Sequence, residues 1–401
     1  MIRMGYVSDE HILELLSTPP FDKYPEFKER LDVFREALTH VSHHDLAVKE
    51  KFGTVSVANL TSEEIKEHMM CCPSNGRLEH LGDAVLEYST CYYLYCTSPA
   101  GAYDDFTTSL TPDKIRNVEN SKLSDLFINE GLRRFILIDP STEAERKTQV
   151  IVKNKLPANF VEALIGAAHV VGGLQCSMGL VYSWILDQEG PEPVPKHVTT
   201  SNEVHRHLVK SAMSLIDPLH FGCEMEEDVL DRFCEAFTFP SSHPIEPNLK
   251  DGYDLAFLGT SVLRLAQAEY FFNTRPYADK GRLTEIKQDV ENLYKICKSM
   301  ASSIRQRTGK ELNLYDWIYT NNSDPTSYNN VLYNIKRKAR LYKSIIGAYS
   351  VAYSFDETSK FIEETILKKI PEYDPSYKAG PEYNPSIATV INRHRSGDDL
   401  S

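Results

Sequence analysis

The chain has 401 residues, 41% of them apolar and 25% charged, and its formal net charge is −13 at pH 7. At roughly 150 residues per domain, this length can bury two cores, and no uninterrupted apolar run reaches the about 18 residues that a membrane-spanning helix needs. Proteins that hold nucleic acid by bulk attraction are usually basic. The charge therefore argues against tight RNA or DNA binding by the chain alone. Any such binding would need a local basic patch, bound metal ions or a partner protein.

The first segments in chain order are an extension and a helix. Residues 1–24 form the N-terminal extension, which has no secretory signal pattern. The stretch "EALTHVSHH", from Glu36, belongs to the first helix of a domain that we place at residues 25–186. Within this domain, residues 45–74 are polar and charged, which predicts an inserted loop with one short helix in "TSEEIKEHMM".

The next segment, "NGRLEHLGDAVLEYSTCYYLY" from Asn75, carries two acids in an otherwise apolar run. Its apolar residues recur at spacings of three and four, which predicts a helix. Glu79 and Asp83 are four residues apart and therefore share one face of that helix. A single acidic pair of this kind usually marks a solvated face, so the pair alone indicates no site.

A second polar pair follows in a helix that we expect to open near Pro157, because proline is favoured in the first turn. Asn159 and Glu162 are three residues apart on one face. The continuation "EALIGAAHVVGG" is rich in small residues, which let another backbone approach closely. This helix is therefore predicted to be central in the domain.

Placed face to face, the two helices would gather three carboxylates and one amide oxygen. Like charges held together repel, and unpaired burial of charge is unfavourable. A divalent cation with hard oxygen ligands resolves the conflict, and Mg²⁺ prefers carboxylates together with water and phosphate. The sequence therefore predicts a Mg²⁺ site, with Mn²⁺ as a substitute, held by Glu79, Asp83, Asn159 and Glu162.

The second half of the chain repeats the first. The motifs "EALTHVSHH", "LEHLGDAVL", "IRNVENSKL" and "FVEALIGAAHV" return in the same order as "EAFTFPSSH", "LAFLGTSVL", "IKQDVENLYKI" and "LYKSIIGAYSV". Alternating β-branched patterns are scarce, so the predicted fold class is all-α, with two tandem helical domains. The Pro-rich residues 187–203 form the linker, residues 204–369 the second domain, and residues 370–401 a disordered tail.

The second copy lacks every predicted metal ligand. The four ligand positions correspond to Ala256, Thr260, Arg340 and Lys343, and their formal charge changes from −3 to +2. A cationic pocket repels Mg²⁺, whereas the apolar positions of the helix are kept. The second copy should therefore fold but not bind the metal.

The motifs resemble those of the ribonuclease III family. "GRLEHLGDAVLEY" resembles that family's signature, usually E-R-L-E-F-L-G-D-A-V, and "LPANFVEALIGA" resembles its second acidic motif. With "EALTHVSHH" these matches cover most of residues 25–370. The resemblance implies a Mg²⁺-dependent endonuclease for double-stranded RNA, in which the two domains form an intramolecular pseudo-dimer around a central valley. The two copies, the insertion and Asn159 in place of aspartate resemble the tandem-domain type represented by Drosha, with Dicer as the competing type.

The resemblance also assigns roles and exposes departures. It implies that Lys155 steadies charge on the phosphate, although a surface lysine beside a helix explains the residue equally well. Gly76 replaces the glutamate that usually begins the signature, and His80 replaces phenylalanine and is expected to be a packed ring. Arg340 and Lys343 either contact RNA phosphate or pair with acids.

The function implied is cleavage of one strand of double-stranded or hairpin RNA per binding event, the 3′ strand of a hairpin by resemblance, in small-RNA precursor processing. The acidic chain and the short tail indicate either that the chain is a fragment or that a basic double-stranded-RNA-binding partner protein delivers the RNA. The resemblance implies domain pairing within the chain rather than a homodimer, and the lack of a long apolar run predicts no membrane partner. The family implies the nucleus, or otherwise the cytoplasm. The eight cysteines form no CxxC pair, which is typical of a chain that is not secreted. The alternative function is a non-catalytic RNA-binding or scaffold protein in a ribonucleoprotein particle.

Overall fold

The fold is known from a computed structural model that describes residues 7–43, 74–97, 118–138, 150–192, 203–217, 226–238, 252–275, 278, 280–281, 283–284, 305 and 331–369. All regular elements in these ranges are helices, and an isolated bridge joins Thr39 to Leu137. The predicted all-α class is therefore confirmed. The inserted loop beyond residue 43 with its expected helix, most of the linker and the whole tail lie outside the described residues.

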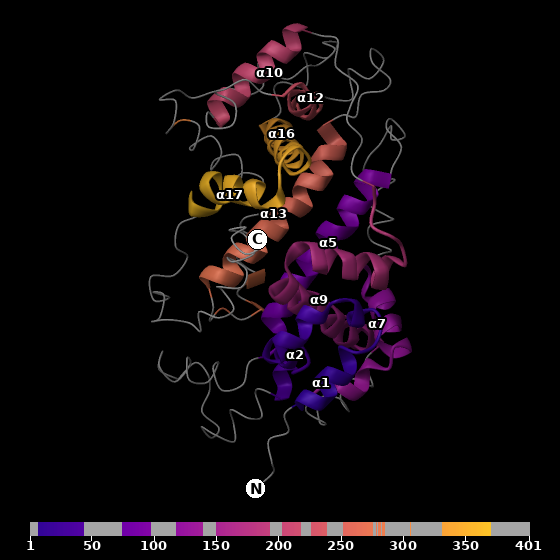
Figure 1. The fold of residues 1–401 in the computed structure, drawn as a ribbon. Coiled ribbons are helices and arrows are strands. Elements are labelled where there is room, and N and C mark those ends of the chain that lie inside the picture. Colours follow the sequence, from indigo (N-terminus) through magenta and orange to yellow (C-terminus); the bar gives the residue numbers. More distant parts are fainter. Residues whose placement is uncertain are drawn as a thin grey trace.

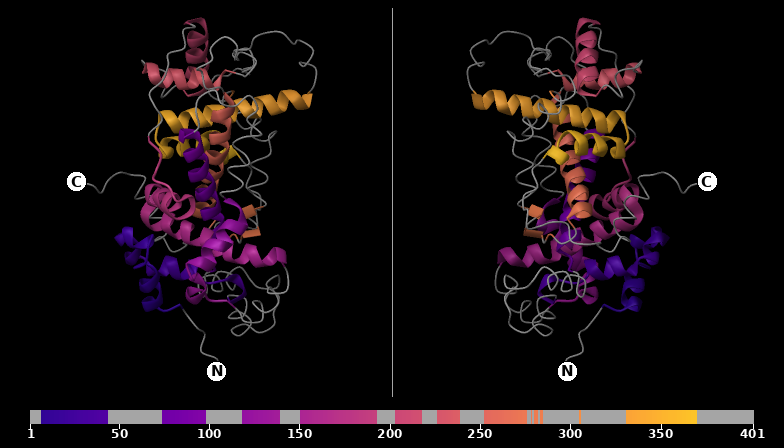
Figure 2. Two further views of the ribbon diagram at one scale, coloured as in Figure 1. Left: turned by 90° about the vertical axis from the view of Figure 1, so that its right-hand side faces the viewer. Right: turned by 90° about the vertical axis from the view of Figure 1, so that its left-hand side faces the viewer.

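The elements divide into two groups that follow the sequence repeat (Figure 1). The first domain contains α1 (Asp9–Leu15), η1 (Phe21–Lys23), η2 (Pro25–Glu29), α2 (Leu31–Ala37), α5 (Gly76–Thr97), α7 (Asn120–Asn129), η4 (Leu132–Phe135), α9 (Val150–Leu180) and η5 (Val181–Leu186). The second contains α10 (Glu203–Ile216), α12 (Glu227–Ala236), α13 (Gly252–Thr274), α16 (Val331–Ala352), α17 (Phe355–Thr365) and η9 (Leu367–Lys369). Views from two sides show the two groups at opposite ends of the molecule, meeting in the middle (Figure 2).

Two glycines set the crossing of α5 and α9 in the first domain. A Cβ atom on Gly82 of α5 would lie 2.7 Å from the carbonyl carbon of Glu162, and one on Gly166 of α9 would lie 2.9 Å from that of Leu78. Cβ atoms essentially never come closer than 3.0 Å to such atoms. The two helices therefore touch backbone to backbone, as the small residues of α9 predicted.

The same crossing recurs in the second domain between α13 and α16. A Cβ on Gly259 would lie 2.8 Å from the carbonyl carbon of Lys343, and one on Gly347 would lie 2.8 Å from that of Leu255. Each of these positions matches its counterpart in the repeat alignment, so Lys343 stands where the first copy has Glu162. The structure thus confirms two copies of one helical arrangement.

The predicted insertion is also measured by equivalent hydrogen bonds. The backbone N–H of Asn75 donates to the carbonyl of Thr39 at 2.9 Å, and that of Gly252 donates to Thr238 at 2.9 Å. The bonded residues are 36 apart in the first copy and 14 apart in the second. The extra length lies between α2 and α5, and the boundaries and the helix predicted for the insertion stay a prediction.

The expected start of the second acidic helix at Pro157 is wrong. Helix α9 begins at Val150, and Pro157 lies inside it. Proline is favoured in the first turn of a helix but does not have to lie there. The residues before Pro157 contain no glycine or proline that would end a helix. Near the other end of α9, Gly173 departs from helical geometry with φ 73° and ψ −172°, which bends the element.

The N-terminal segment packs onto the first domain. Ser8 caps α1 by accepting a hydrogen bond from the backbone of His11 at 3.3 Å. The side chains of Ile12, Leu15 and Phe21 are at most 1% exposed and belong to the main hydrophobic core. Residues 9–24, expected as an extension, therefore contribute to the core of the domain.

One stretch, Lys155–Leu186, is long and apolar enough in composition to cross a membrane, with a mean hydropathy of 1.5. However, 67% of its most apolar window is buried inside the protein. Its apolar residues are accounted for by the central position of α9, which contacts α2, α5 and α7.

The two domains meet along α5 and α13, which lie side by side (Figure 1). The guanidinium of Arg77 donates to the carbonyl of Phe272 at 2.6 Å and lies 4.5 Å from the centre of its ring. Arg264 pairs with Glu87 across the same boundary. These contacts join the two copies within one chain.

A half-buried acid, Glu36, gives a prediction for stability. Burial raises the pKa of Glu36 from 4.5 to about 7; the charge of Arg77 lowers it and that of Asp32 raises it further. At pH values between 4.5 and about 7, Glu36 holds more protons in the folded state than in the unfolded state, so this group makes the protein less stable as pH rises. Glu36→Gln should raise the free energy of unfolding at pH 8 by about 1–3 kcal/mol and flatten its decline from pH 5.

Urea unfolding at pH 5 and pH 8 measures this effect. Glu10→Gln, which neutralises an exposed acid of α1, is the control and should leave the pH dependence unchanged. An equal decline in the parent protein and in Glu36→Gln would show that Glu36 is ionised normally in the folded state.

Candidate active site

Glu79 is the most deeply buried of the predicted ligands, with 3% of its surface exposed in the first turn of α5. Its carboxylate accepts a hydrogen bond from the ammonium group of Lys280, a residue of the second domain. Burial raises the pKa of Glu79; the charges of Lys280 and Lys155 lower it, and that of Asp83 raises it. Asp83 and Lys155 are therefore close enough to act on this carboxylate.

Helix α9 brings the other predicted residues to the same place. Glu162 is 8% exposed, and its backbone carbonyl is the group that Gly82 touches at the crossing. Asn159 lies one turn earlier on α9 and is half-buried, while Lys155 is exposed. The close crossing thus brings the α5 backbone that carries Glu79 and Asp83 next to the α9 backbone that carries the second polar pair.

The Glu79 and Asp83 carboxylates are close enough for the charge of one to affect the other, but they belong to no closed cluster of acids among the described residues. Across the part of the chain that the structure describes, no group of three or more His, Cys, Asp or Glu side chains is arranged to hold a metal ion. The Glu79 carboxylate is engaged by Lys280 instead. The backbone arrangement was predictable from the sequence, but this side-chain pairing was not.

The donor chemistry at the crossing suits a hard divalent cation. Glu79, Asp83, Glu162 and Asn159 offer only oxygen ligands, and burial of Glu79 leaves its charged form short of solvation. A divalent ion would relieve the repulsion between Glu79 and Asp83. When bound, such an ion lowers the pKa of a water ligand and stabilises charge on a phosphodiester.

The matching positions of the second domain offer no carboxylate. Ala256 is buried, and the Thr260 hydroxyl donates to the carbonyl of Ala256 at 2.7 Å. The guanidinium of Arg340 lies 4.1 Å from the centre of the Tyr253 ring, a cation–π contact. Arg340 is thus in contact with its own domain, while Lys343 is half-buried at the crossing.

Lys280 is the residue that sequence reasoning missed. It belongs to no motif and lies 201 residues from Glu79 in the chain. One signal could have pointed to it: Gly76, where the signature usually has glutamate. A Cβ on Gly76 would lie 3.4 Å from the Cβ of Lys280, so this departure from the signature lies beside the lysine.

Two further residues belong to the repeated motifs, His80 to "LEHLGDAVL" and Asn120 to "IRNVENSKL". His80, expected to be a packed ring, is 8% exposed on α5. Asn120 is the first residue of α7 and is exposed.

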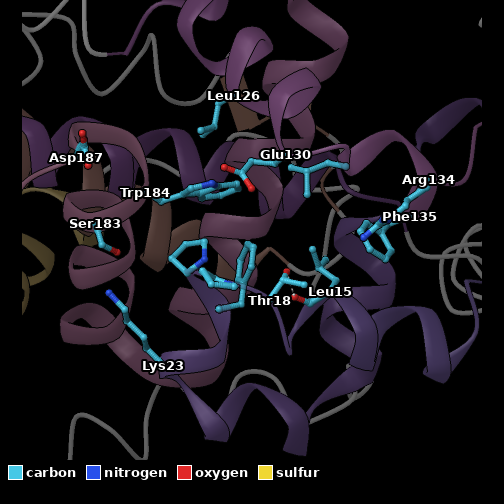
Figure 3. A pocket seen from close by; sticks show the side chains of 14 residues that line it. Leu15, Thr18, Lys23, Leu126, Glu130, Arg134, Phe135, Ser183, Trp184 and Asp187 are labelled. Carbon is cyan, nitrogen blue, oxygen red and sulfur yellow. Dashed lines mark hydrogen bonds between the residues drawn. The ribbon is translucent and has the colours of Figure 1, made fainter.

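A separate cavity of about 650 Å³ lies between the N-terminal segment, α7, η4 and η5 (Figure 3). Trp184 lies in its centre, beside Glu130 in this view. The indole N–H of Trp184 is buried and has no hydrogen-bond partner among the described residues. None of the predicted site residues lines this cavity, so it is distinct from the crossing of α5 and α9.

Comparisons with known proteins agree with these observations. The model of the ribonuclease III domain matches residues 76–173 and 254–353, one match in each copy. Ribonuclease 3 from Homo sapiens is 24% identical over 314 residues, which cover 75% of this chain and 21% of the relative. Dicer-like protein 2 from Emericella nidulans is 26% identical over 232 residues, 54% of this chain and 16% of the relative.

The chain therefore spans about a fifth of the length of these relatives. The resemblance seen in the motifs is confirmed, since the two matched ranges contain both acidic helices and their counterparts. The chain belongs to the ribonuclease III family, as a member with two ribonuclease III domains in tandem.

Proposed function

We propose that the chain is a Mg²⁺-dependent endoribonuclease that cuts double-stranded or hairpin RNA, with its only cutting centre in the first domain. The family consists of endoribonucleases for double-stranded RNA, and the observation that carries the finer proposal is the pair of glycine crossings. In the first, Gly82 packs against the backbone carbonyl of Glu162, which supports a common site for Glu79, Asp83 and Glu162. In the second, the same crossing carries no acid at the four positions.

In the first domain, Glu79, Asp83, Asn159 and Glu162 would hold Mg²⁺, or Mn²⁺ as a substitute. The charge of Lys155 lowers the pKa of Glu79, which supports a position of its ammonium group near the proposed reaction centre. There it would stabilise negative charge that develops on the phosphate. The buried surroundings of Glu79 strengthen such interactions because they exclude water.

The second domain would complete the RNA-binding valley without cutting. The contacts of Arg77 with Phe272 and of Arg264 with Glu87 support pairing within the chain rather than between two chains. Lys343 is proposed to contact RNA phosphate, and Arg340 would have to leave the Tyr253 ring to do the same. The net charge of −13 supports delivery of RNA by a basic partner protein. By resemblance to the family, we propose small-RNA precursors as the substrate and the nucleus as the compartment.

One test uses a hairpin RNA labelled on each strand in turn and incubated with the protein and Mg²⁺. We expect cleavage of one strand, the 3′ strand, with products that carry a 5′ phosphate and a 3′ hydroxyl. A single centre acts on one phosphodiester per binding event, so the other strand should stay intact. Equal cleavage of both strands would show a second working centre, in this chain or in a homodimer.

The alternative function is a non-catalytic RNA-binding protein with the same fold. The observation that favours it is the Glu79–Lys280 pair, which takes up a carboxylate that a metal would need. Glu162→Gln separates the two functions. It removes cleavage and keeps RNA binding if the first domain is an enzyme.

A further inference from the structure

Lys280 reaches from the second domain into the candidate active site of the first. It follows α13 and lies near the interface with α5, and its ammonium group donates to the Oε1 atom of Glu79. The Glu79 side chain is 4% exposed and that of Lys280 is 37% exposed. The acid is therefore enclosed, while the lysine enters from the solvent side.

The first domain leaves space for this lysine at Gly76. Gly76 and Glu79 are three residues apart on α5 and share one face of the helix. The position of a Gly76 Cβ would be 3.4 Å from the Cβ of Lys280, which is ordinary contact for one methyl group. A longer acidic side chain at this position would have to share the space that the stem of Lys280 occupies.

The ammonium group of Lys280 supplies the positive charge that the buried Glu79 carboxylate needs, and a divalent ion would supply it as well. A buried carboxylate without a counter-charge is strongly destabilising, and burial dominates the raised pKa of Glu79. Lys280 and a divalent cation would be two positive groups at one carboxylate, and like charges at this range repel. They therefore compete.

We propose that Lys280 is a positioning residue supplied by the second domain, which holds Glu79 in the metal-free protein and is displaced from it when the divalent ion binds. This inference rests on the proposed function and gives the second domain a direct part in the first domain's site. Metal entry then depends on how the two domains are paired. The loss of ligands in the second copy leaves this contribution intact.

Titration of the full-length chain with Mn²⁺, without RNA, tests the competition. Lys280→Met should bind Mn²⁺ about tenfold more tightly than the parent, since the ion no longer has to break an ion pair. Arg264→Met is the matched control, because it removes another cross-domain ion pair, to Glu87, which is not a predicted ligand. It should leave the Mn²⁺ affinity unchanged.

A second control separates displacement from simple charge. Lys155→Met removes a cation that also acts on Glu79 without a hydrogen bond to it. If nearby charge alone were responsible, Lys155→Met would tighten Mn²⁺ binding as much as Lys280→Met does. We expect a smaller change for Lys155→Met, and near-parental affinity for Lys280→Arg, which keeps the charge.

Thermal unfolding tests the proposal without an RNA cleavage assay. In EDTA, Lys280→Met should melt below the parent, because Glu79 stays buried without its partner. With saturating Mn²⁺ the difference should vanish, whereas Arg264→Met should stay destabilised in both conditions. Equal Mn²⁺ affinity of the parent and Lys280→Met, with strand cleavage intact, would overturn this inference alone. Absence of Mn²⁺ binding and of cleavage in both proteins would overturn the proposed function as well.

Discussion

Glu162→Gln should reduce single-turnover cleavage of hairpin RNA by about 10²–10³-fold, while RNA affinity stays near that of the parent. The amide keeps the size of the side chain but carries no charge for a divalent ion. Glu162 is 8% exposed on α9, and its backbone adjoins Gly82, so the loss falls where the acids of α5 lie. Single-turnover reactions, with the protein in saturating excess over the labelled RNA and with saturating Mg²⁺, separate the cleavage step from RNA binding and product release.

The control for this variant is Glu364→Gln, which neutralises an exposed acid of α17 in the second domain. It should cleave at the parental rate. Undiminished cleavage by Glu162→Gln would show that the metal is held elsewhere. A parent protein that binds the hairpin and does not cut it with Mg²⁺ or Mn²⁺ would support the non-catalytic alternative.

The repeat and the helix crossings could be read from the sequence because local pattern determines them. Spacings of three and four define the helical faces, and the small residues of "EALIGAAHVVGG" indicate a close helix contact. Gly82 and Gly166 then bring together the backbones of the helices that carry the two polar pairs, and Gly259 and Gly347 repeat the crossing without acids. This asymmetry between the two copies is present in the residues themselves.

The pairing of Glu79 could not be read in the same way. Lys280 lies 201 residues away, and its approach depends on how α5 and α13 pack after both domains have formed. Nothing in the local sequence around Lys280 marks it. The start of α9 was missed for a related reason, because a preference for proline in the first turn does not prevent a helix from beginning earlier.

The buried pair of His169 and Glu269 illustrates the same limit. The His169 ring lies 2.8 Å from the Glu269 carboxylate in the other domain, and both side chains are almost fully buried. In the sequence, each looks like a polar residue interrupting an apolar helix face. Only the packing of the two domains explains why burial of these groups is tolerated, because each is the hydrogen-bond partner of the other.

Gly82→Ala should destabilise the first domain by about 3–5 kcal/mol. The added methyl group meets backbone atoms, which cannot move aside by a change of rotamer as a side chain could. The new Cβ would lie 2.7 Å from the carbonyl carbon of Glu162 and 2.8 Å from the amide nitrogen of Gly166. Helices α5 and α9 would have to separate, which opens the core and moves Glu79 and Asp83 away from Asn159 and Glu162. We expect a fall in melting temperature of about 10 °C and loss of cleavage.

Gly76→Ala in the same helix is the matched control for stability. Its Cβ would meet only the Cβ of Lys280 at 3.4 Å, so the melting temperature should change little. Gly259→Ala makes the equivalent clash in the second domain, 2.8 Å from the carbonyl carbon of Lys343, and should destabilise the protein to a similar degree. If Gly82→Ala melted within about 2 °C of the parent, the backbone contact at the α5–α9 crossing would be disproved, and with it the placement of Glu79 and Asp83 beside Glu162.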